Sequence, residues 1–238
     1  MHIYMWSGPR NLSTALMRSF ENRVDTEVWD EPLYAYYLKE TKKNHPIAKD
    51  IINTYETNID KLISKITKDI GKRILYQKHM THHILSKTPI DWIKNGVNCF
   101  LIRNPKEVIQ SYINKNELNN SNDIGFPTQI KLFNIVKDLG IKPIIINAED
   151  LSSNPKKVLV SLCKNLNIPF STKMLKWPKG KRQSDGIWGK VWYKNVQSST
   201  NFVKLKKNKS TIPKKYMNIY YECLDIYNKL NHNNIVNE

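Results

Sequence analysis

Residues 5–16 have the sequence Met5-Trp6-Ser7-Gly8-Pro9-Arg10-Asn11-Leu12-Ser13-Thr14-Ala15-Leu16. An apolar run enters a Gly-Pro turn, and the apolar spacing after the turn predicts a helix. The stretch therefore predicts a strand, a turn and a helix in succession. Such a turn gathers unpaired backbone N–H groups at the positive end of a helix dipole, which favours a bound phosphate or sulfate.

The turn differs from the Walker A loop, which has the sequence G-x-x-x-x-G-K-[ST]. Aligned on Gly8, it lacks the second glycine, the lysine and the magnesium-binding hydroxyl of that motif. Their positions hold Ser13, Thr14 and Ala15. With Arg10 as its strong cation, the loop suits an anion held without an obligatory metal. An ordinary turn with a serine as helix cap accounts equally well for this segment alone.

The composition is that of a folded protein with a large positive charge. The chain has 238 residues, of which 40% are hydrophobic, and a formal net charge of +17. This length suits one α/β domain over residues 1–238. No apolar run approaches the roughly 20 residues of a membrane span, and the first strand is too short for a signal peptide. We therefore expect a cytoplasmic protein without a membrane span.

The positive charge raises the alternative of nucleic-acid binding, which depends on clustered Lys and Arg. Here the lysines are scattered along the whole chain and greatly outnumber the arginines. We expect most of them to be solvated, with no specific nucleic acid as partner. The excess charge still favours small polyanions, including nucleotide-like cofactors.

Apolar runs of strand and helix character alternate along the chain. Strands are expected over residues 3–6, 27–29, 73–78, 98–102 and 142–147. After the first helix, further helices are expected over residues 33–38, 55–70, 105–112, 128–139, 154–166 and 213–230. The apolar strands suit burial on both faces. This order predicts a three-layer α/β fold of the P-loop-like type, with a central parallel sheet flanked by helices.

A second basic turn follows the strand 98–102. Arg103 lies at the carboxyl end of this strand, and Pro105 suits the first turn of the next helix. Ser111 lies about two turns into that helix, where its hydroxyl can meet the same anion as Arg103. Because ligands of open parallel sheets collect at the edge where the strands end, the two turns predict one shared site.

Together the two turns resemble the cofactor loops of sulfotransferases that use 3'-phosphoadenosine-5'-phosphosulfate (PAPS). Residues 7–14 resemble the 5'-phosphosulfate loop, and Arg103 with Ser111 resembles the 3'-phosphate motif. Residues 181–188 are similar to the late loop of the family, a basic pair followed by G-x-x-G-x-W, with Gln183 in place of the first glycine. Residues 186–193 most resemble the bacterial sulfotransferase-like branch. The resemblance extends from about residue 1 to residue 203.

The resemblance implies a set of cofactor-binding residues. They are Ser7, Gly8, Pro9, Arg10, Asn11, Ser13, Thr14, Arg103, Ser111, Lys181, Arg182, Trp192 and Tyr193. Ser13 and Thr14 would donate to the 5'-phosphate, and Arg103 and Ser111 to the 3'-phosphate. The pair Lys181-Arg182 would close over the 3'-phosphate. Arg10 stands where the family usually has a lysine. A guanidinium stays protonated, so its catalytic role would be electrostatic.

The base that takes the proton of the acceptor is commonly, in this family, a histidine just after the strand that corresponds to residues 73–78. We favour His83, with His82 and His79 as alternatives. Glu31 is a further candidate because some sulfotransferases use a carboxylate. Its other interpretation is a cap or salt bridge of the helix that follows.

Neither the histidines nor the cysteines form a convincing metal site. Adjacent histidines without a nearby Cys or acidic partner have poor ligand geometry, and we expect them at the surface. The three cysteines are far apart in apolar sequence, which predicts buried thiols rather than disulfides. They are Cys99, Cys163 and Cys223.

The sequence thus predicts an enzyme that moves the sulfuryl group of PAPS to a hydroxyl or amine of a small-molecule acceptor. One alternative is a nucleotide-dependent, kinase-like phosphotransferase, which the missing Walker lysine disfavours. Magnesium-dependent ATP turnover would support it. The other is a non-catalytic protein that binds a nucleotide or a nucleic acid, and steep salt dependence of nucleic-acid binding would support the latter.

Overall fold

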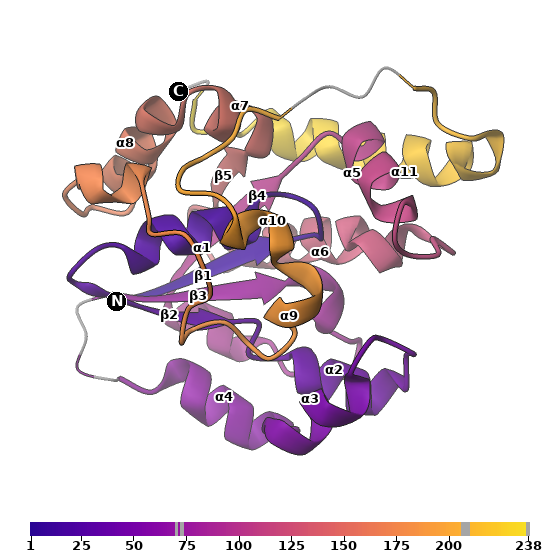
Figure 1. Ribbon diagram of the computed structural model, residues 1–238, viewed down its shortest axis with the longest axis horizontal. Coiled ribbons are helices and arrows are strands. Elements are labelled where there is room, and N and C mark those ends of the chain that lie inside the picture. Colours follow the sequence, from indigo (N-terminus) through magenta and orange to yellow (C-terminus); the bar gives the residue numbers. More distant parts are fainter. Residues whose placement is uncertain (70, 72–73, 206–209, 237–238) are drawn as a thin grey trace.

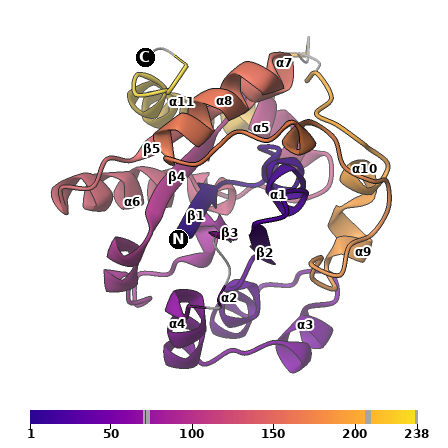
Figure 2. The same ribbon diagram turned by 90° about the vertical axis from the view of Figure 1, so that its left-hand side faces the viewer.

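A computed structural model describes residues 1–69, 71, 74–205 and 210–236 of the chain. At its centre is a parallel sheet of five strands in the order β2-β3-β1-β4-β5. The strands are β1 (His2–Ser7), β2 (Thr26–Asp30), β3 (Ile74–Met80), β4 (Val97–Ile102) and β5 (Ile144–Asn147). Figure 1 and Figure 2 show helices on both faces of this sheet. The predicted α/β fold, with a central parallel sheet between helical layers, is confirmed.

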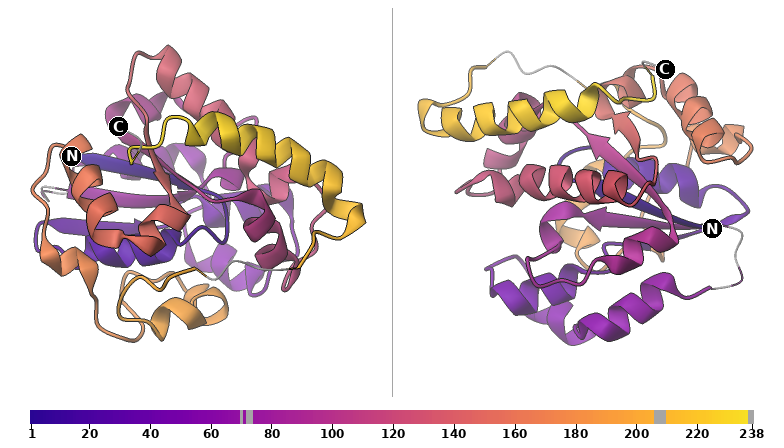
Figure 3. Two further views of the ribbon diagram at one scale, coloured as in Figure 1. Left: turned by 90° about the horizontal axis from the view of Figure 1, so that it is seen from above. Right: turned by 180° about the vertical axis from the view of Figure 1, so that it is seen from behind.

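The side chains of β1 alternate between the two helical layers, as expected for a strand buried on both faces. Ile3 and Met5 belong to a core with α1 (Ser13–Glu21), α7 (Ala148–Ser153) and α8 (Pro155–Asn165). Tyr4 and Trp6 belong to a second core with α5 (Pro105–Ile113), α6 (Phe126–Asp138) and α11 (Met217–Asn231). The view from behind in Figure 3 shows α6 and α11 next to each other on the face opposite α1.

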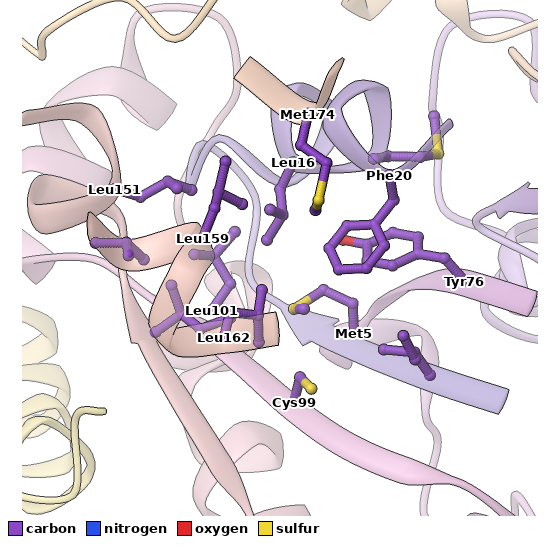
Figure 4. Close-up of a cluster of buried hydrophobic side chains, with 14 of the residues drawn as sticks. Met5, Leu16, Phe20, Tyr76, Cys99, Leu101, Leu151, Leu159, Leu162 and Met174 are labelled. Carbon is purple, nitrogen blue, oxygen red and sulfur yellow. The ribbon is translucent and has the colours of Figure 1, made fainter. Parts of the chain in front are cut away.

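The core beneath α1 holds the first helix firmly on the sheet (Figure 4). The ring of Phe20 on α1 stacks on Tyr76 of β3 with 4.5 Å between centroids. Met5, Leu101 and Leu162 are fully buried in the same cluster. Burying side chains of this size contributes roughly 1.5–3 kcal/mol each, so α1 and the loop before it have a fixed position.

Three strands end side by side at one edge of the sheet. Ser7, the last residue of β1, is in register with Met80 of β3 and with Leu101 of β4. The loop 8–12 and the 3-10 turn η1 (Thr81–His83) therefore begin at the same level. Their proximity follows from the parallel register of the three strands.

Two predicted helices, 55–70 and 213–230, begin later in the structure, at Ile59 and Met217. The helix predicted over residues 55–70 is α4 (Ile59–Thr67), because the side chain of Asn58 accepts the Lys61 N–H at 3.0 Å and caps it there. Ile70 and Arg73, the ends of a predicted helix and a predicted strand, lie outside the described residues. The helix predicted over residues 213–230 is α11, which a 3-10 turn precedes.

Several short helices were not predicted because they are too short to show a periodic pattern. They are α3 (Ala48–Thr54), α7, α9 (Gly189–Trp192) and α10 (Lys194–Gln197). The aromatic helix after β2 is present as α2 (Tyr34–Thr41). None of the helices in the described residues combines the length and the apolar character that crossing a bilayer requires. All three cysteines are buried and unpaired, as predicted.

Candidate functional site

The loop between β1 and α1 has a compact, unusual backbone. Arg10 and Leu12 have φ angles of 67° and 66°, in the left-handed region that side chains rarely adopt. A Cβ atom on Gly8 would lie 2.5 Å from the carbonyl oxygen of Ile124, so only glycine fits there. The residue that caps α1 is Leu12, and within the described part of the chain no side chain accepts the first N–H groups of this helix. The alternative of a serine-capped turn is therefore wrong, and these N–H groups are available to an anion.

The structure brings the two basic turns together. The Arg10 Nε atom donates a hydrogen bond to Ser111 Oγ at 2.8 Å, and Arg103 Nη1 donates to the Arg10 carbonyl oxygen at 2.6 Å. The Arg103 Nε atom is buried without a hydrogen-bond partner, although the Glu149 carboxylate lies 3.7 Å away. Burial lowers the pKa of both guanidiniums. Two neighbouring, partly desolvated cations form a place for an anion with more than one charge.

Other loop side chains hold the loop rather than face outward. Ser7 is fully buried, and its hydroxyl donates to the Gly8 carbonyl oxygen at 2.8 Å. The Asn11 amide is buried and lies 3.3 Å from the Leu101 carbonyl oxygen, which it approaches as a donor. Ser7 and Asn11 are thus placed to offer a ligand their backbone rather than their side chains. Pro9 and Thr14 are partly exposed.

Lys78, in β3, is the main residue of the site that sequence reasoning missed. Its Nζ atom lies 2.7 Å from Asp30 Oδ1, 2.7 Å from Glu31 Oε1 and 2.6 Å from the Tyr193 hydroxyl. It also lies 3.3 Å from Thr14 Oγ1, at the start of α1. A lysine in a strand that is otherwise buried throughout must have charged partners, and that was the available signal.

The Lys78 cluster places a cation and two carboxylates beside the loop. Although burial opposes the shift, the carboxylates of Asp30 and Glu31 raise the pKa of Lys78. Burial and the charge of Asp30 raise the pKa of Glu31, while Lys78 opposes this shift. The backbone of Glu31 has a φ angle of 43°. Residues with a strained backbone and carboxylates with a raised pKa are both common in functional sites.

The late loop is attached to this cluster through Asp30. The Asp30 Oδ2 atom accepts hydrogen bonds from Trp188 Nε1 at 3.0 Å and from the Tyr193 hydroxyl at 2.7 Å. A Cβ on Gly186 would overlap the Trp188 ring at 2.2 Å, so the turn needs glycine. Tyr193 is buried and held by its hydrogen bonds to Asp30 and Glu31, whereas Trp192 is half-buried. The segment 186–193 therefore closes over the end of β2, as Figure 1 shows for α9.

The basic pair of the late loop lies away from Arg103. Lys181 is exposed, and the Arg182 Nε atom lies 3.7 Å from Glu21, the last residue of α1. In the part of the chain that the structure describes, neither residue makes a hydrogen bond or ion pair with Arg103 or Ser111. The pair is therefore held at the opposite end of α1 from the loop 8–12, and its closing over a phosphate stays a prediction.

Two histidines that were expected at the surface are buried. The His83 ring is 2% exposed and stacks between Tyr34 and Tyr37, with centroid distances of 4.8 and 4.7 Å. His79 is buried against Trp6 at 4.7 Å. Burial lowers the pKa of His79 and His82 to about 3 and that of His83 well below its usual value. All three imidazoles are thus weak bases in this environment.

We expect the free energy of unfolding to decrease as the pH falls below about 6.5. Unfolded histidines take up protons near that pH, whereas the buried rings of His79 and His83 and the half-buried ring of His82 stay neutral in the folded protein. The unfolded chain then binds more protons, so stability falls by up to about 1.4 kcal/mol per pH unit for each ring. Urea unfolding near pH 7 and near pH 5.5 measures this slope. His83→Phe should reduce it, and an unchanged slope would contradict the account; His232→Gln, at an exposed position, is the control.

Comparison with known proteins identifies relatives over nearly the whole chain. Residues 1–228 match the model of the family described as "Sulfotransferase domain". Two Arabidopsis thaliana proteins, named branched-chain-amino-acid aminotransferase-like proteins 1 and 2, are 36% and 35% identical over 229 residues. These residues are 96% of this chain but 41% of each relative, so the chain spans about two fifths of their length.

Three solved structures that share the fold of this chain are a sulfotransferase and two sulfotransferase domains. The sulfotransferase domain of the Synechococcus olefin synthase has a TM-score of 0.62 at 16% identity, covering 95% of this chain and 93% of that one. The sulfotransferase of Alicyclobacillus acidocaldarius has a TM-score of 0.57 at 8% identity, with coverage of 98% and 96%. The sulfotransferase domain of the curacin biosynthetic pathway has a TM-score of 0.53 at 17% identity, with coverage of 92% and 96%. At these identities the likeness concerns the fold.

Proposed function

This chain belongs to the sulfotransferase domain family, and we propose that it is an enzyme that transfers the sulfuryl group of PAPS to a hydroxyl or amine of a small-molecule acceptor. One observation carries the proposal: two strand-to-helix turns meet through Arg10, Arg103 and Ser111 beside a helix start that no side chain caps. Such a site suits a ligand with two separate phosphates.

The donor set fits the two ends of the cofactor. The uncapped N–H groups of α1 and the partly exposed Thr14 hydroxyl would hold the 5'-phosphosulfate. Arg103 would hold the 3'-phosphate, since its buried Nε atom has no hydrogen-bond partner in the structure. Bound there, PAPS supplies an activated sulfuryl group with a phosphate leaving group.

Two cations would stabilise the negative charge that develops on the leaving group. Arg10 lies in the loop itself, but its Nε atom is directed to Ser111. Lys78 reaches the first turn of α1, 3.3 Å from Thr14 Oγ1, and its ammonium is held by fixed carboxylates. We therefore assign Lys78 the position beside the leaving group and Arg10 a role in electrostatics and loop shape.

Glu31 is the base that the electrostatics favour. A general base works best when its pKa lies near the working pH, and the pKa of Glu31 is raised whereas that of His83 is lowered by burial. The Glu31 side chain keeps 11% exposure and contacts Lys78. His82 and His83 remain the alternative bases, because both follow β3 at the same edge of the sheet.

We expect Glu31→Gln to lower kcat at least ~100-fold, the smaller end of the range for general-base catalysis, with little change in cofactor affinity. The assay measures 3'-phosphoadenosine-5'-phosphate (PAP) formed from PAPS in the presence of a mixture of phenols, sugars and amines. His83→Phe, which keeps an aromatic ring between Tyr34 and Tyr37, serves as the matched comparison. An active Glu31→Gln together with an inactive His83→Phe would assign the base to His83.

A further inference from the structure

A polar cavity lies beside the loop at the carboxyl edge of the sheet. Its volume is about 720 Å³, and its walls come from α2, the turn η1 with residues 84–91, and residues 120–132. This volume is within the range of about 300–1,000 Å³ that proteins use for small organic ligands. His82 is the histidine that lines it.

A thin layer of backbone lies between the cavity and the cofactor loop. Asp123 lines the cavity, and the next residue, Ile124, has its carbonyl oxygen 2.5 Å from where a Cβ on Gly8 would lie. The Thr81 hydroxyl donates to the Gly125 carbonyl oxygen at 3.0 Å and lies 3.4 Å from the Ser7 carbonyl oxygen. A molecule in the cavity is therefore close to the start of the loop.

The charged groups inside the cavity are paired with each other. Lys43 Nζ lies 2.5 Å from Asp123 Oδ1. The other carboxylate oxygen of Asp123 accepts the N–H groups of Asn119 and Asn120 at 2.9 and 3.2 Å. Burial keeps His82 neutral near pH 7, because it lowers the pKa to about 3. The interior thus offers no unpaired charge to a ligand.

The positive and negative charges around the opening of the cavity also balance. The exposed charged side chains of its lining are Lys43, which is paired with Asp123, and Lys131 and Asp91. The lining therefore holds two lysines and two aspartates, although the whole chain carries a net charge of +17. A charged ligand would lose its hydration here without gaining a partner of opposite charge, and this penalty disfavours it.

The remaining lining matches a molecule with hydroxyl groups on one side. The side chains of Ser86, Asn122 and Thr128 line the cavity and make no hydrogen bonds within the described residues. The cavity is also lined by apolar side chains, among them Leu85 and Leu132. Free hydroxyl and amide groups next to an apolar wall suit a polar ligand that also presents an apolar face.

We propose that this cavity binds the body of the acceptor, and that the acceptor is an uncharged molecule with several hydroxyl groups and one apolar face. Of the proposed bases, His82 lines the cavity and Glu31 does not, so the reacting hydroxyl has to extend beyond the lining to meet Glu31. The proposal rests on the proposed sulfuryl transfer and narrows its acceptor from hydroxyl or amine compounds to neutral hydroxyl compounds. It also assigns Lys131 and Asp91 a role in charge preference, since among the described residues they are the exposed charges of the lining that have no ion-pair partner.

The test compares three probes of one size that differ in charge. They are 4-nitrophenyl β-glucoside, the corresponding glucuronide and the 6-amino-6-deoxy glucoside. Calorimetry with the full chain, with and without saturating PAP, measures the affinity for each probe, and sulfuryl transfer from PAPS to each is measured in parallel. We expect the neutral glucoside to bind at least ~10-fold more tightly than either charged probe, a difference of one decade in Kd.

Two variants locate the binding to the cavity. Asn122→Trp places a large ring in the cavity from an exposed position and should weaken glucoside binding at least ~10-fold while PAP binding stays within about twofold. Lys131→Glu should improve binding of the amino probe ~5-fold by making the rim acidic. Lys137→Glu, an equal charge change on α6 outside the lining, is the matched control and should change neither affinity.

The outcomes separate this proposal from the function on which it rests. If PAP binds but the glucuronide or the amino probe equals the glucoside, the neutral-acceptor inference is wrong and the proposed cofactor stands. If Asn122→Trp leaves glucoside affinity unchanged, the acceptor does not lie in this cavity. If the glucoside binds and PAP does not, the cavity has no sulfuryl donor beside it, and the acceptor role is overturned with the proposed function.

Discussion

Replacement of Arg103 by alanine is expected to weaken PAP binding by about 100-fold or more. A charge-assisted hydrogen bond to a phosphate, lost at a partly buried site, typically costs 2–5 kcal/mol, and about 2.7 kcal/mol corresponds to 100-fold. Arg103 is 8% exposed, and its Nε atom makes no hydrogen bond within the described residues, although Glu149 lies 3.7 Å away, so it has the position and a donor for a phosphate. Calorimetric titration with PAP measures the loss.

The conservative variant Arg103→Lys separates charge from geometry. A lysine keeps the charge but not the planar fork, so we expect a loss between that of alanine and the wild type. Because Arg103 also donates to the Arg10 carbonyl oxygen, thermal unfolding must show that each variant is folded. Lys137→Ala, at an exposed position on α6, controls for the loss of one positive charge. Equal PAP affinity in Arg103→Ala and the wild type would remove Arg103 from the cofactor site.

Replacement of Lys78 by methionine is expected to lower the free energy of unfolding by about 3–5 kcal/mol and to abolish sulfuryl transfer. Removing one partner from a buried ion pair leaves an uncompensated buried charge, which accounts for a loss of this size. Lys78 is 1% exposed and is the cation between Asp30 and Glu31. Denaturant unfolding measures the stability, and PAP formation from PAPS measures the activity.

A double variant distinguishes the charge from the packing of Lys78. In Lys78→Met/Glu31→Gln an uncharged amide replaces one of the two carboxylates that lost their cation. We therefore expect the double variant to be more stable than Lys78→Met alone. Sulfuryl transfer should be absent in the single and in the double variant, because both lack the Lys78 ammonium. If Lys78→Met is as stable as the wild type, the carboxylates are not charged partners of Lys78 in the folded protein, and the cluster has been misinterpreted.

The sequence predicted the parts of the site that depend on local patterns. The Gly-Pro turn after an apolar run and the arginine at the end of the strand 98–102 are features of adjacent residues, and each predicted its strand, turn and helix. Strand alternation then predicted that the two turns share an edge, and Arg10 and Ser111 are indeed hydrogen-bonded across it. The α/β fold followed from these patterns and the family from the resemblance of the motifs, and both are confirmed.

The parts that the sequence did not predict depend on long-range packing. Lys78 and Tyr193 are 115 positions apart, and nothing in their local sequence indicates a shared hydrogen bond with Asp30. The burial of His83 depends on two tyrosines of α2 that happen to stack on it. The basic pair of the late loop was placed by resemblance, whereas in the structure Arg182 lies near Glu21. Such contacts are set by tertiary structure and leave no periodic signal.

Calorimetric titration of the wild-type protein with PAP tests the central claim most directly, because PAP carries both phosphates of the proposed cofactor and needs no acceptor. The account predicts one-to-one binding with a Kd of about 10 µM or lower, and a large loss of affinity in Arg103→Ala. An absence of binding at millimolar PAP would contradict the account.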